Sequence, residues 1–282
     1  MDGLVFAAIA PHGGITIAEA CAPDERGVAA ATRAGMEAMS AHFVAARPEV
    51  AILLTPHNVH LSGAMAVIGA GAIAGALAGA AQPITLRGPI DRVLTYALRE
   101  ALVAGGVPTV EVSYGGNDAA SATMPMDWAT LVPYWFLGGR TSPQIPLVVV
   151  APARDLSEEQ HIRAGRIIAA TARDSGKRVA LIASADNAHT HDADGPYGFS
   201  PIAAEYDRAI VKAVRDNFLP EVRNIEPALV ADAKADSWWQ LLMLSGALEG
   251  TAWDSELLSY EAPTYFGMLC AAYTPSVVLA NA

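Results

Sequence analysis

The chain has 282 residues, of which 52% are hydrophobic and 17% are charged, so it can bury a sizeable core and is not intrinsically disordered. Its formal net charge at pH 7 is −11, from 18 Lys and Arg against 29 Asp and Glu. Such a charge repels a phosphate backbone, which disfavours nucleic acid as a partner and favours a small molecule.

Cysteine is rare. Cys21 and Cys270 lie far apart in the sequence, with no second pair that would make a disulfide framework or a Cys-x-x-Cys zinc site. The amino terminus has no basic segment of the kind that begins a secretion signal. We therefore expect a reducing compartment and a cytoplasmic location.

Short apolar runs alternate with helical-period segments along the chain. The runs predict strands at residues 4–9, 50–54, 109–112, 146–150 and 179–183. The periodic segments predict helices from about residue 25 to Pro48 and at residues 91–104, 157–176, 201–217 and 236–248. This alternation indicates a single α/β domain over residues 1–282, with a central, largely parallel or mixed sheet flanked by helices.

One uncharged segment, residues 63–81, approaches the length of a membrane span. Its Ala and Gly content and the lack of flanking basic residues favour a buried strand at residues 65–68 followed by a packed turn or short helix. A minor alternative is a dinucleotide fingerprint, Gly-x-Gly-x-x-Ala at residues 69–74, with Asp91 at the ribose-binding distance. Pro83 leaves little room for the helix that this motif needs.

Histidines follow three of the predicted strands. His12 comes after the first strand, His57 after the second, and His189 and His191 after the strand at residues 179–183. A single histidine in such a place often only bonds a carbonyl group. Because ligands bind at the carboxyl ends of strands in open α/β sheets, however, we expect these three segments to converge on one site.

Two histidines and one carboxylate on one face of a metal ion leave other coordination positions open, as in non-heme Fe(II) oxygenases. His12 and His57 are the predicted pair. Glu261 is the best third ligand, because it stands in an aromatic-rich, otherwise uncharged stretch where an unpaired charge is costly. Other candidates remain open: the carboxylates of Asp118, Asp186, Asp192 and Asp194, and His60 in place of His57.

Four short motifs carry a family resemblance. They are Ala-x-x-x-Pro-His ending at His12, Thr-Pro-His ending at His57, Ser-x-x-x-x-His ending at His189, and Tyr-Glu-x-Pro-Thr-Tyr-Phe-Gly around Glu261. In this order they resemble the class III extradiol ring-cleaving dioxygenases, the group of protocatechuate 4,5-dioxygenase beta subunits. The resemblance spans residues 4–273 and implies one α/β domain.

The resemblance implies that His12, His57 and Glu261 bind Fe(II) and that His189 is the acid and base, with His191 as a competitor two residues further on. Trp128 stands where relatives often carry a histidine. The implied reaction opens the ring of a catechol or aminophenol and places both atoms of dioxygen in the product, without nicotinamide or flavin.

The implied partners are a small aromatic substrate and dioxygen, with no nucleic acid and no membrane. The resemblance also implies a homo-oligomer, or an assembly with a small partner subunit. Two alternatives stay open: a non-catalytic relative that binds a partner, and a zinc-dependent hydrolase on the same fold.

Overall fold

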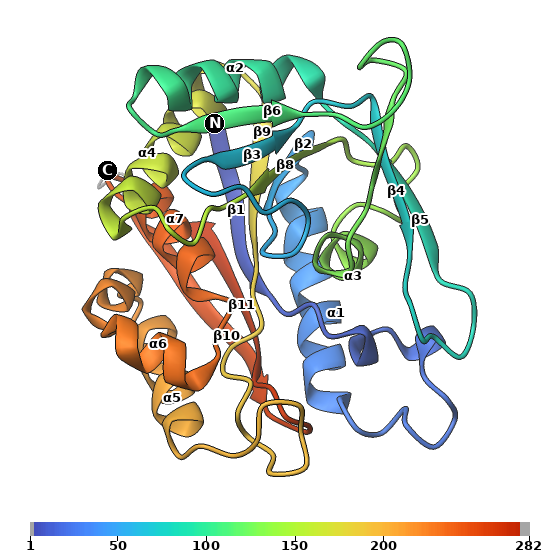
Figure 1. Cartoon of the computed structure of the whole chain (residues 1–282), viewed down its shortest axis with the longest axis vertical. Coiled ribbons are helices and arrows are strands. Elements are labelled where there is room, and N and C mark those ends of the chain that lie inside the picture. Colours follow the sequence, from blue (N-terminus) through green and yellow to red (C-terminus); the bar gives the residue numbers. More distant parts are fainter. Residues whose placement is uncertain (1–2, 277–282) are drawn as a thin grey trace, which may run out of the picture.

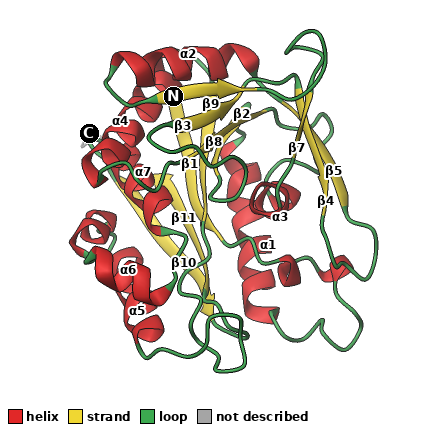
Figure 2. Cartoon of the chain, viewed as in Figure 1, coloured by secondary structure: helices red, strands yellow, loops and turns green. Residues whose placement is uncertain are grey.

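An eight-stranded mixed sheet runs through the molecule, with helices on both of its faces (Figures 1 and 2). The computed structural model describes residues 3–276, so residues 1–2 and 277–282 of the predicted domain lie outside the described part. The predicted fold class, α/β with one domain and a mixed sheet flanked by helices, is confirmed.

Four parallel strands form the centre of the large sheet, in the order β1 (Gly3–Ala10), β9 (Arg178–Ser184), β2 (Val50–Leu54) and β8 (Leu147–Ala151). They are nearly continuous apolar runs because helices cover both faces of the sheet. Their carboxyl ends meet at one edge, which is where the segments that follow these strands come together.

On either side of this parallel core, some strands run parallel and others antiparallel to their neighbours. On one side, β11 (Met268–Pro275) pairs antiparallel with β1, and β10 (Trp253–Glu261) pairs antiparallel with β11. On the other side, β3 (Met65–Ile68) runs antiparallel to β8 and parallel to β6 (Thr109–Val112). The sequence pattern predicts β3 and β6 but not the terminal hairpin of β10 and β11.

The Ala and Gly-rich segment after β3 forms part of a second sheet. Its strands are β4 (Ala72–Ala76), β5 (Thr85–Pro89) and β7 (Thr123–Pro125), in the order β5-β4-β7. The expected turn or short helix after β3 is therefore wrong, because β4 pairs on both sides as a strand.

The dinucleotide alternative fails for the same reason, because β4 begins where that motif needs a helix. Asp91 caps the amino end of α2 (Arg92–Ala104) by accepting a hydrogen bond from the Leu94 N–H, and it also pairs with Lys177. Within residues 3–276, no helix has both the length and the apolar character to cross a membrane.

One face of the large sheet is covered by α2, α4 (Glu158–Asp174), α5 (Ile202–Arg215) and α7 (Trp238–Leu248), which share one apolar core with it. The short helix α6 (Pro227–Ala233) packs beside α5 and leads into α7. A 3-10 helix, η3 (Leu219–Asn224), connects α5 to α6. The chain between α6 and α7 lies at the carboxyl edge of the sheet (Figure 1).

The helices α4 and α7 pack with their backbones in contact. A Cβ atom on Gly165 would lie 1.9 Å from the Met243 carbonyl oxygen, and one on Gly246 would lie 2.0 Å from the Ile162 carbonyl oxygen. Glycine at both positions is what allows this close approach. The contact fixes the start of α7 relative to the sheet.

The other face is covered by α1 (Ala30–Ala46), α3 (Trp128–Phe136) and the small sheet. Two short 3-10 helices, η1 (Gly14–Thr16) and η2 (Ala18–Ala20), follow β1. The helix α1 begins at Ala30 rather than near residue 25, and its N-cap residue, Ala29, makes no capping hydrogen bond through its side chain. The acceptor for this end of α1 comes from elsewhere in the chain.

Candidate functional site

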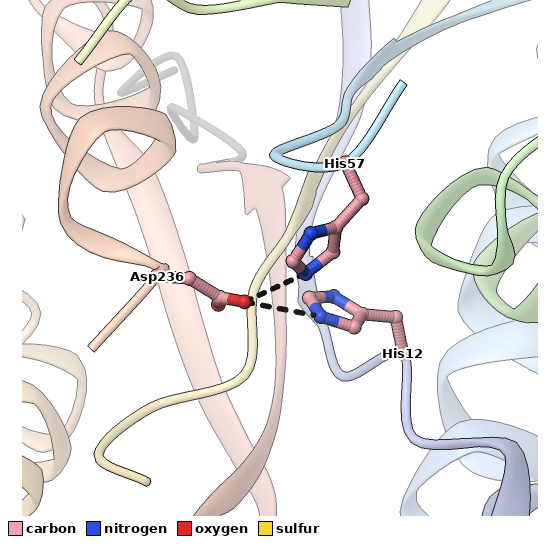
Figure 3. Close-up of side chains that lie close together, drawn as sticks. All are labelled: His12, His57 and Asp236. Carbon is pink, nitrogen blue, oxygen red and sulfur yellow. Dashed lines mark hydrogen bonds and ion pairs between the residues drawn. The ribbon is translucent and has the colours of Figure 1, made fainter. Parts of the chain in front are cut away.

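Three side chains from distant parts of the sequence meet at the carboxyl edge of the sheet (Figure 3). His12 follows β1, His57 follows β2, and Asp236 lies two residues before the start of α7. One ligand atom from each lies within 4.8 Å of the other two. Asp236 Oδ2 is 2.8 Å from His57 Nε2 and 3.5 Å from His12 Nε2.

The neighbouring strand β9 orients His12. His12 Nδ1 lies 3.0 Å from the hydroxyl oxygen of Ser184, and the His12 backbone N–H donates to Asp186 Oδ1 at 2.9 Å. The Nδ1 contact orients the ring so that Nε2 faces two carboxylates, with Asp186 Oδ2 at 3.3 Å and Asp236 Oδ2 at 3.5 Å. A histidine that binds a metal is held in the same way, through its other ring nitrogen.

Asp127 and Trp128 support His57 from the opposite side. The His57 backbone N–H donates to the hydroxyl oxygen of Thr55, which in turn donates to Asp127 Oδ1 at 2.8 Å. Asp127 also caps α3 by accepting from the Thr130 N–H. The indole of Trp128 stacks on the His57 ring, with centroids 4.4 Å apart, so this tryptophan covers His57.

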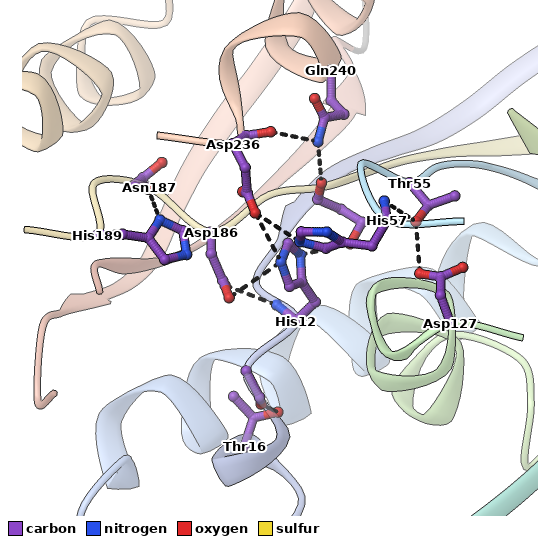
Figure 4. A network of polar contacts seen from close by, with 12 residues as sticks. His12, Thr16, Thr55, His57, Asp127, Asp186, Asn187, His189, Asp236 and Gln240 are labelled. Carbon is purple, nitrogen blue, oxygen red and sulfur yellow. Dashed lines mark hydrogen bonds and ion pairs between the residues drawn. The ribbon is translucent and has the colours of Figure 1, made fainter. Parts of the chain in front are cut away.

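Asp236 is buried, and its backbone is tied to β9. Gln240 Nε2 donates to the Asp236 carbonyl at 2.8 Å and to the Ser184 carbonyl at 2.9 Å (Figure 4). Asp236 Oδ1 has no hydrogen-bond partner among residues 3–276. Because an unpartnered buried carboxylate oxygen is costly, this atom fits a site that holds a cation.

Two buried carboxylates face His12. Burial alone would lower the pKa of His12, but Asp186 and Asp236 outweigh it and raise the pKa to about 9. Burial raises the pKa of Asp186. For Asp236 the effect of burial is overcome by His12 and His57, which hold its pKa well below the usual range. The site thus concentrates negative charge, which a proton on His12 or a bound metal ion would neutralise.

Glu261, the predicted third ligand, is not part of this cluster. Its Oε1 atom accepts hydrogen bonds from the Thr32 N–H at 2.6 Å and from the Thr32 hydroxyl at 2.7 Å. Thr32 lies in the first turn of α1, whose free N–H groups need acceptors. The charge of Glu261 is therefore balanced by a helix amino terminus, and Asp236 takes the third place beside His12 and His57.

His189 has a defined tautomer. Its Nδ1 lies 2.9 Å from the Asn187 carbonyl oxygen, which can only accept, so Nδ1 carries the proton and Nε2 is left as an acceptor. The ring stacks on Phe266, with centroids 5.6 Å apart. His189 lines the same cavity as His12 and His57.

His191 lies outside that cavity lining and is engaged elsewhere. Its Nε2 is 2.7 Å from Asp207 Oδ2. The buried Asp207 carboxylate also accepts from the Tyr260 hydroxyl at 2.7 Å and from the Ala188 N–H at 2.9 Å. His191 therefore helps to fasten the loop that carries His189 to α5 and β10.

The cavity has a volume of about 930 Å³, which suits a small organic ligand. At its floor are His12, His57 and Asp236. Its walls include Trp128, Tyr197, Trp238, Trp239, Tyr265 and Phe266, and two cationic residues, Arg154 and Lys234, also line it. An aromatic ligand fits such walls.

Comparison with known families gives the family of this chain. A family described as "Catalytic LigB subunit of aromatic ring-opening dioxygenase" matches residues 6–269. The chain belongs to the LigB family. The resemblance drawn from the four sequence motifs is thus confirmed.

Two similar proteins show how close the similarity to known proteins is. "Protein CA_C1420" of Clostridium acetobutylicum is 24% identical over 252 residues, which cover 89% of this chain and 53% of that protein. The chain thus spans about half the length of this curated relative. A crystal structure described as an uncharacterized protein, JW3007 from Escherichia coli K12, aligns with a TM-score of 0.60 and 16% identity over 95% of this chain and 99% of that one, which shows a shared fold.

The other ligands considered for this LigB chain lie apart from the cluster, except for Asp186 beside His12. Four of these candidates lie outside the cluster and are exposed: Asp118, Asp192, Asp194 and His60. Sequence reasoning missed Asp236 as a ligand. Asp236 precedes residues 237–248, which carry no charge and include two tryptophans, so the sequence held a signal for Asp236 similar to the one for Glu261, although Lys234 lies two residues before it.

Proposed function

We propose that this LigB chain is an Fe(II)-dependent extradiol dioxygenase that opens the ring of a catechol-type substrate, either a dihydroxy aromatic or an aminophenol. His12, His57 and Asp236 are the proposed metal ligands, with Asp236 in place of Glu261. The observation that carries the proposal is the cluster of two histidines and one carboxylate that line an aromatic-walled cavity. His12 and Asp236 are buried and His57 is half-buried, and one Asp236 oxygen has no partner among residues 3–276.

When bound, Fe(II) would lower the pKa of a coordinated hydroxyl group and hold the substrate and dioxygen close together. The protein supplies the proton transfer. His189 presents Nε2 as its acceptor because Nδ1–H is committed to the Asn187 carbonyl. We propose that His189 takes a proton from a substrate hydroxyl and returns it during ring opening.

The aromatic walls orient the ring and exclude water. Trp128 covers His57 on one side, and Phe266 and Tyr265 flank His189 on the other. A flat aromatic substrate between these groups would have its reacting edge toward the cluster and His189, which is the orientation the reaction needs.

The test is anaerobic reconstitution with Fe(II), followed by oxygen and a panel of catechols and aminophenols. We expect uptake of dioxygen with a yellow ring-opened product, lost in the His12→Ala, His57→Ala and Asp236→Ala variants and retained in Glu261→Ala. Protein that binds iron yet consumes no dioxygen with any member of the panel would overturn the proposal.

Two other outcomes would favour the alternatives. Binding of metal without any turnover would favour a non-catalytic relative that binds a partner. Turnover of a hydrolysable substrate by the zinc-loaded protein, without oxygen uptake by the iron-loaded protein, would favour the hydrolase. The expected homo-oligomer or small partner subunit and the cytoplasmic location stay predictions.

A further inference from the structure

Two adjacent residues of α5, Tyr206 and Asp207, contact two different parts of the candidate site. Both side chains are buried, and neither is among the residues that line the cavity. Consecutive side chains of an α-helix point about 100° apart, so such a pair can hold two separate segments. Because burial takes a hydroxyl and a carboxylate out of water, each needs hydrogen-bond partners within the protein.

The carboxylate of Asp207 holds the loop that carries His189. Its Oδ1 atom accepts a hydrogen bond from the N–H of Ala188, the residue before His189, at 2.9 Å. Its Oδ2 atom lies 2.7 Å from the hydroxyl oxygen of Tyr260 and 2.7 Å from Nε2 of His191. A buried aspartate inside a helix is unfavourable by itself, so these partners from outside α5 are what stabilise it.

The same carboxylate lies against the backbone of a second loop. A Cβ atom on Gly267 would lie 2.0 Å from Asp207 Oδ2, so glycine is what permits this approach. The Gly267 N–H donates to the Ala188 carbonyl at 2.9 Å. Phe266, in the same loop, stacks on the ring of His189. Asp207 therefore contacts both loops that set the position of the His189 ring.

Tyr206 holds the other half of the site. Its hydroxyl oxygen lies 2.8 Å from the hydroxyl oxygen of Ser237, the residue after Asp236. Ser237 is the N-cap residue of α7, where a serine hydroxyl usually accepts from a backbone N–H of the first turn. Among the described residues, Ser237 makes no such capping bond, and its hydroxyl is engaged with Tyr206 instead. This contact ties the backbone that carries Asp236 to α5.

We propose that Tyr206 and Asp207 are positioning residues, Tyr206 for the metal ligand Asp236 and Asp207 for the proton acceptor His189. One helix, α5, then sets the distance between the metal centre and the base, although neither residue touches a substrate. This inference rests on the function proposed above and adds the residues that hold its two halves in place. Because the two contacts are separate, loss of one should leave the other intact.

The first measurement is the tautomer of His189, read from the ring nitrogen NMR signals of the zinc-loaded protein with 15N-labelled histidine. The signals are assigned by their loss in His189→Phe. Wild-type protein and Tyr206→Phe should show only the Nδ1–H tautomer. Asp207→Asn, which has one acceptor oxygen in place of two, and Asp207→Ala, which has none, should show a mixture of both tautomers. In the iron-loaded protein, both Asp207 variants should lower kcat at least about tenfold with KM unchanged.

The second measurement is the affinity for Zn²⁺, by chelator competition. Tyr206→Phe should raise the Kd for zinc about tenfold, because the backbone that carries Asp236 loses its contact with α5. Asp207→Asn should leave this Kd unchanged. The two variants thus have opposite patterns, which a general loss of stability does not produce.

Two variants remove comparable groups outside the site. Tyr134 is a buried tyrosine whose hydroxyl donates to the Ile145 carbonyl at 2.8 Å. Asp91 is a carboxylate that caps α2 and pairs with Lys177. We expect Tyr134→Phe and Asp91→Asn to lower the melting temperature, and to leave the His189 tautomer and the Kd for zinc unchanged.

The outcomes separate this inference from the proposed function. The expected pattern of tautomer and zinc affinity, in a protein that consumes no dioxygen with any catechol, would support the positioning roles and overturn the dioxygenase. Oxygen uptake by the wild-type protein, with the Tyr206 and Asp207 variants no different from the controls, would do the reverse. Variants at Tyr206 and Asp207 that each change both measurements would also overturn the separate roles.

Discussion

Asp236 is a buried carboxylate with one oxygen near two imidazoles and the other without a partner among the described residues. Replacing it with asparagine removes the charge that a metal ion requires while keeping the shape of the side chain. We expect Asp236→Asn to weaken binding of Fe(II) or Zn²⁺ by at least about 100-fold. Competition with a coloured chelator measures this change, and unaltered affinity would remove Asp236 from the site.

Glu261→Ala is the matched control for this prediction. Because Glu261 accepts both hydrogen bonds from Thr32 at the start of α1, its loss should lower the free energy of unfolding by about 1–2 kcal/mol. Metal affinity should not change. Loss of metal from Glu261→Ala with normal stability would restore Glu261 as the ligand.

The raised pKa of His12 predicts a pH dependence of metal binding. With a pKa of about 9, His12 carries a proton at pH 7 that a metal ion has to displace. Apparent affinity should therefore rise with pH, by about tenfold per unit between pH 7 and 9, and then level off. Chelator competition at several pH values measures it, and a flat profile would contradict proton displacement from His12.

We expect substitutions of His189 and His191 to have different effects, the first on kcat and the second on stability. His189→Phe should lower kcat by about 100-fold or more, because the proposed proton acceptor is lost. His191→Phe leaves the buried Asp207 with one partner fewer, so it should lower the melting temperature more than kcat. Steady-state oxygen uptake and thermal unfolding of both variants give the comparison, and the reverse result would make His191 the acid and base.

At the scale of elements, the close crossing of α4 and α7 is sensitive to the volume of the side chains placed there. Gly165→Ala would place a Cβ atom against the Met243 carbonyl, which cannot move without shifting α7. We expect a loss of about 1–3 kcal/mol in the free energy of unfolding. We also expect weaker metal binding, because Asp236 lies two residues before the start of α7.

Gly27→Ala is the control for this substitution, because a Cβ atom there would meet nothing within 4 Å. Denaturant unfolding compares the two variants. Equal stability of Gly165→Ala and Gly27→Ala would show that α4 and α7 can move apart without lowering the free energy of unfolding.

Topology explains which parts of the site the sequence pattern could predict. His12, His57 and His189 follow strands whose apolar runs are plain, and parallel strands place their carboxyl ends at one edge. Asp236 follows a short helix, and its position depends on how α7 packs against α4 and β9, which no spacing in the sequence records. The convergence of the histidines was predictable, but the sequence alone could not show which of the candidate carboxylates joins them.

The helices and strands predicted least well are those whose sequences show neither a helical nor a strand repeat of apolar residues. The strand β4 lies in an Ala and Gly-rich run whose residues favour neither repeat, and its pairing with β5 and β7 decides its conformation. Helix α1 starts at Ala30 because Glu261, 229 positions away from Thr32, provides the acceptor at its amino end.

At the scale of the whole molecule, a metal at this centre would join three parts of the fold: the ends of β1 and β2 and the start of α7. Binding to the folded state alone stabilises it by about 2.7 kcal/mol at a metal concentration 100 times the Kd. We therefore expect Zn²⁺ to raise the melting temperature of the wild-type protein. Scanning fluorimetry measures this rise, and an equal rise in Asp236→Asn would place the ion elsewhere.

The order of the strands has a consequence for biosynthesis. β1 lies between β9 and β11, and His12 and His57 leave the ribosome long before Asp236 does. When only this part of the chain has been made, the two imidazoles have no Asp236 carboxylate beside them, and β1 lacks its neighbours β9 and β11. If this cluster holds a metal ion as proposed, its three ligands are available together only after Asp236 has been synthesised.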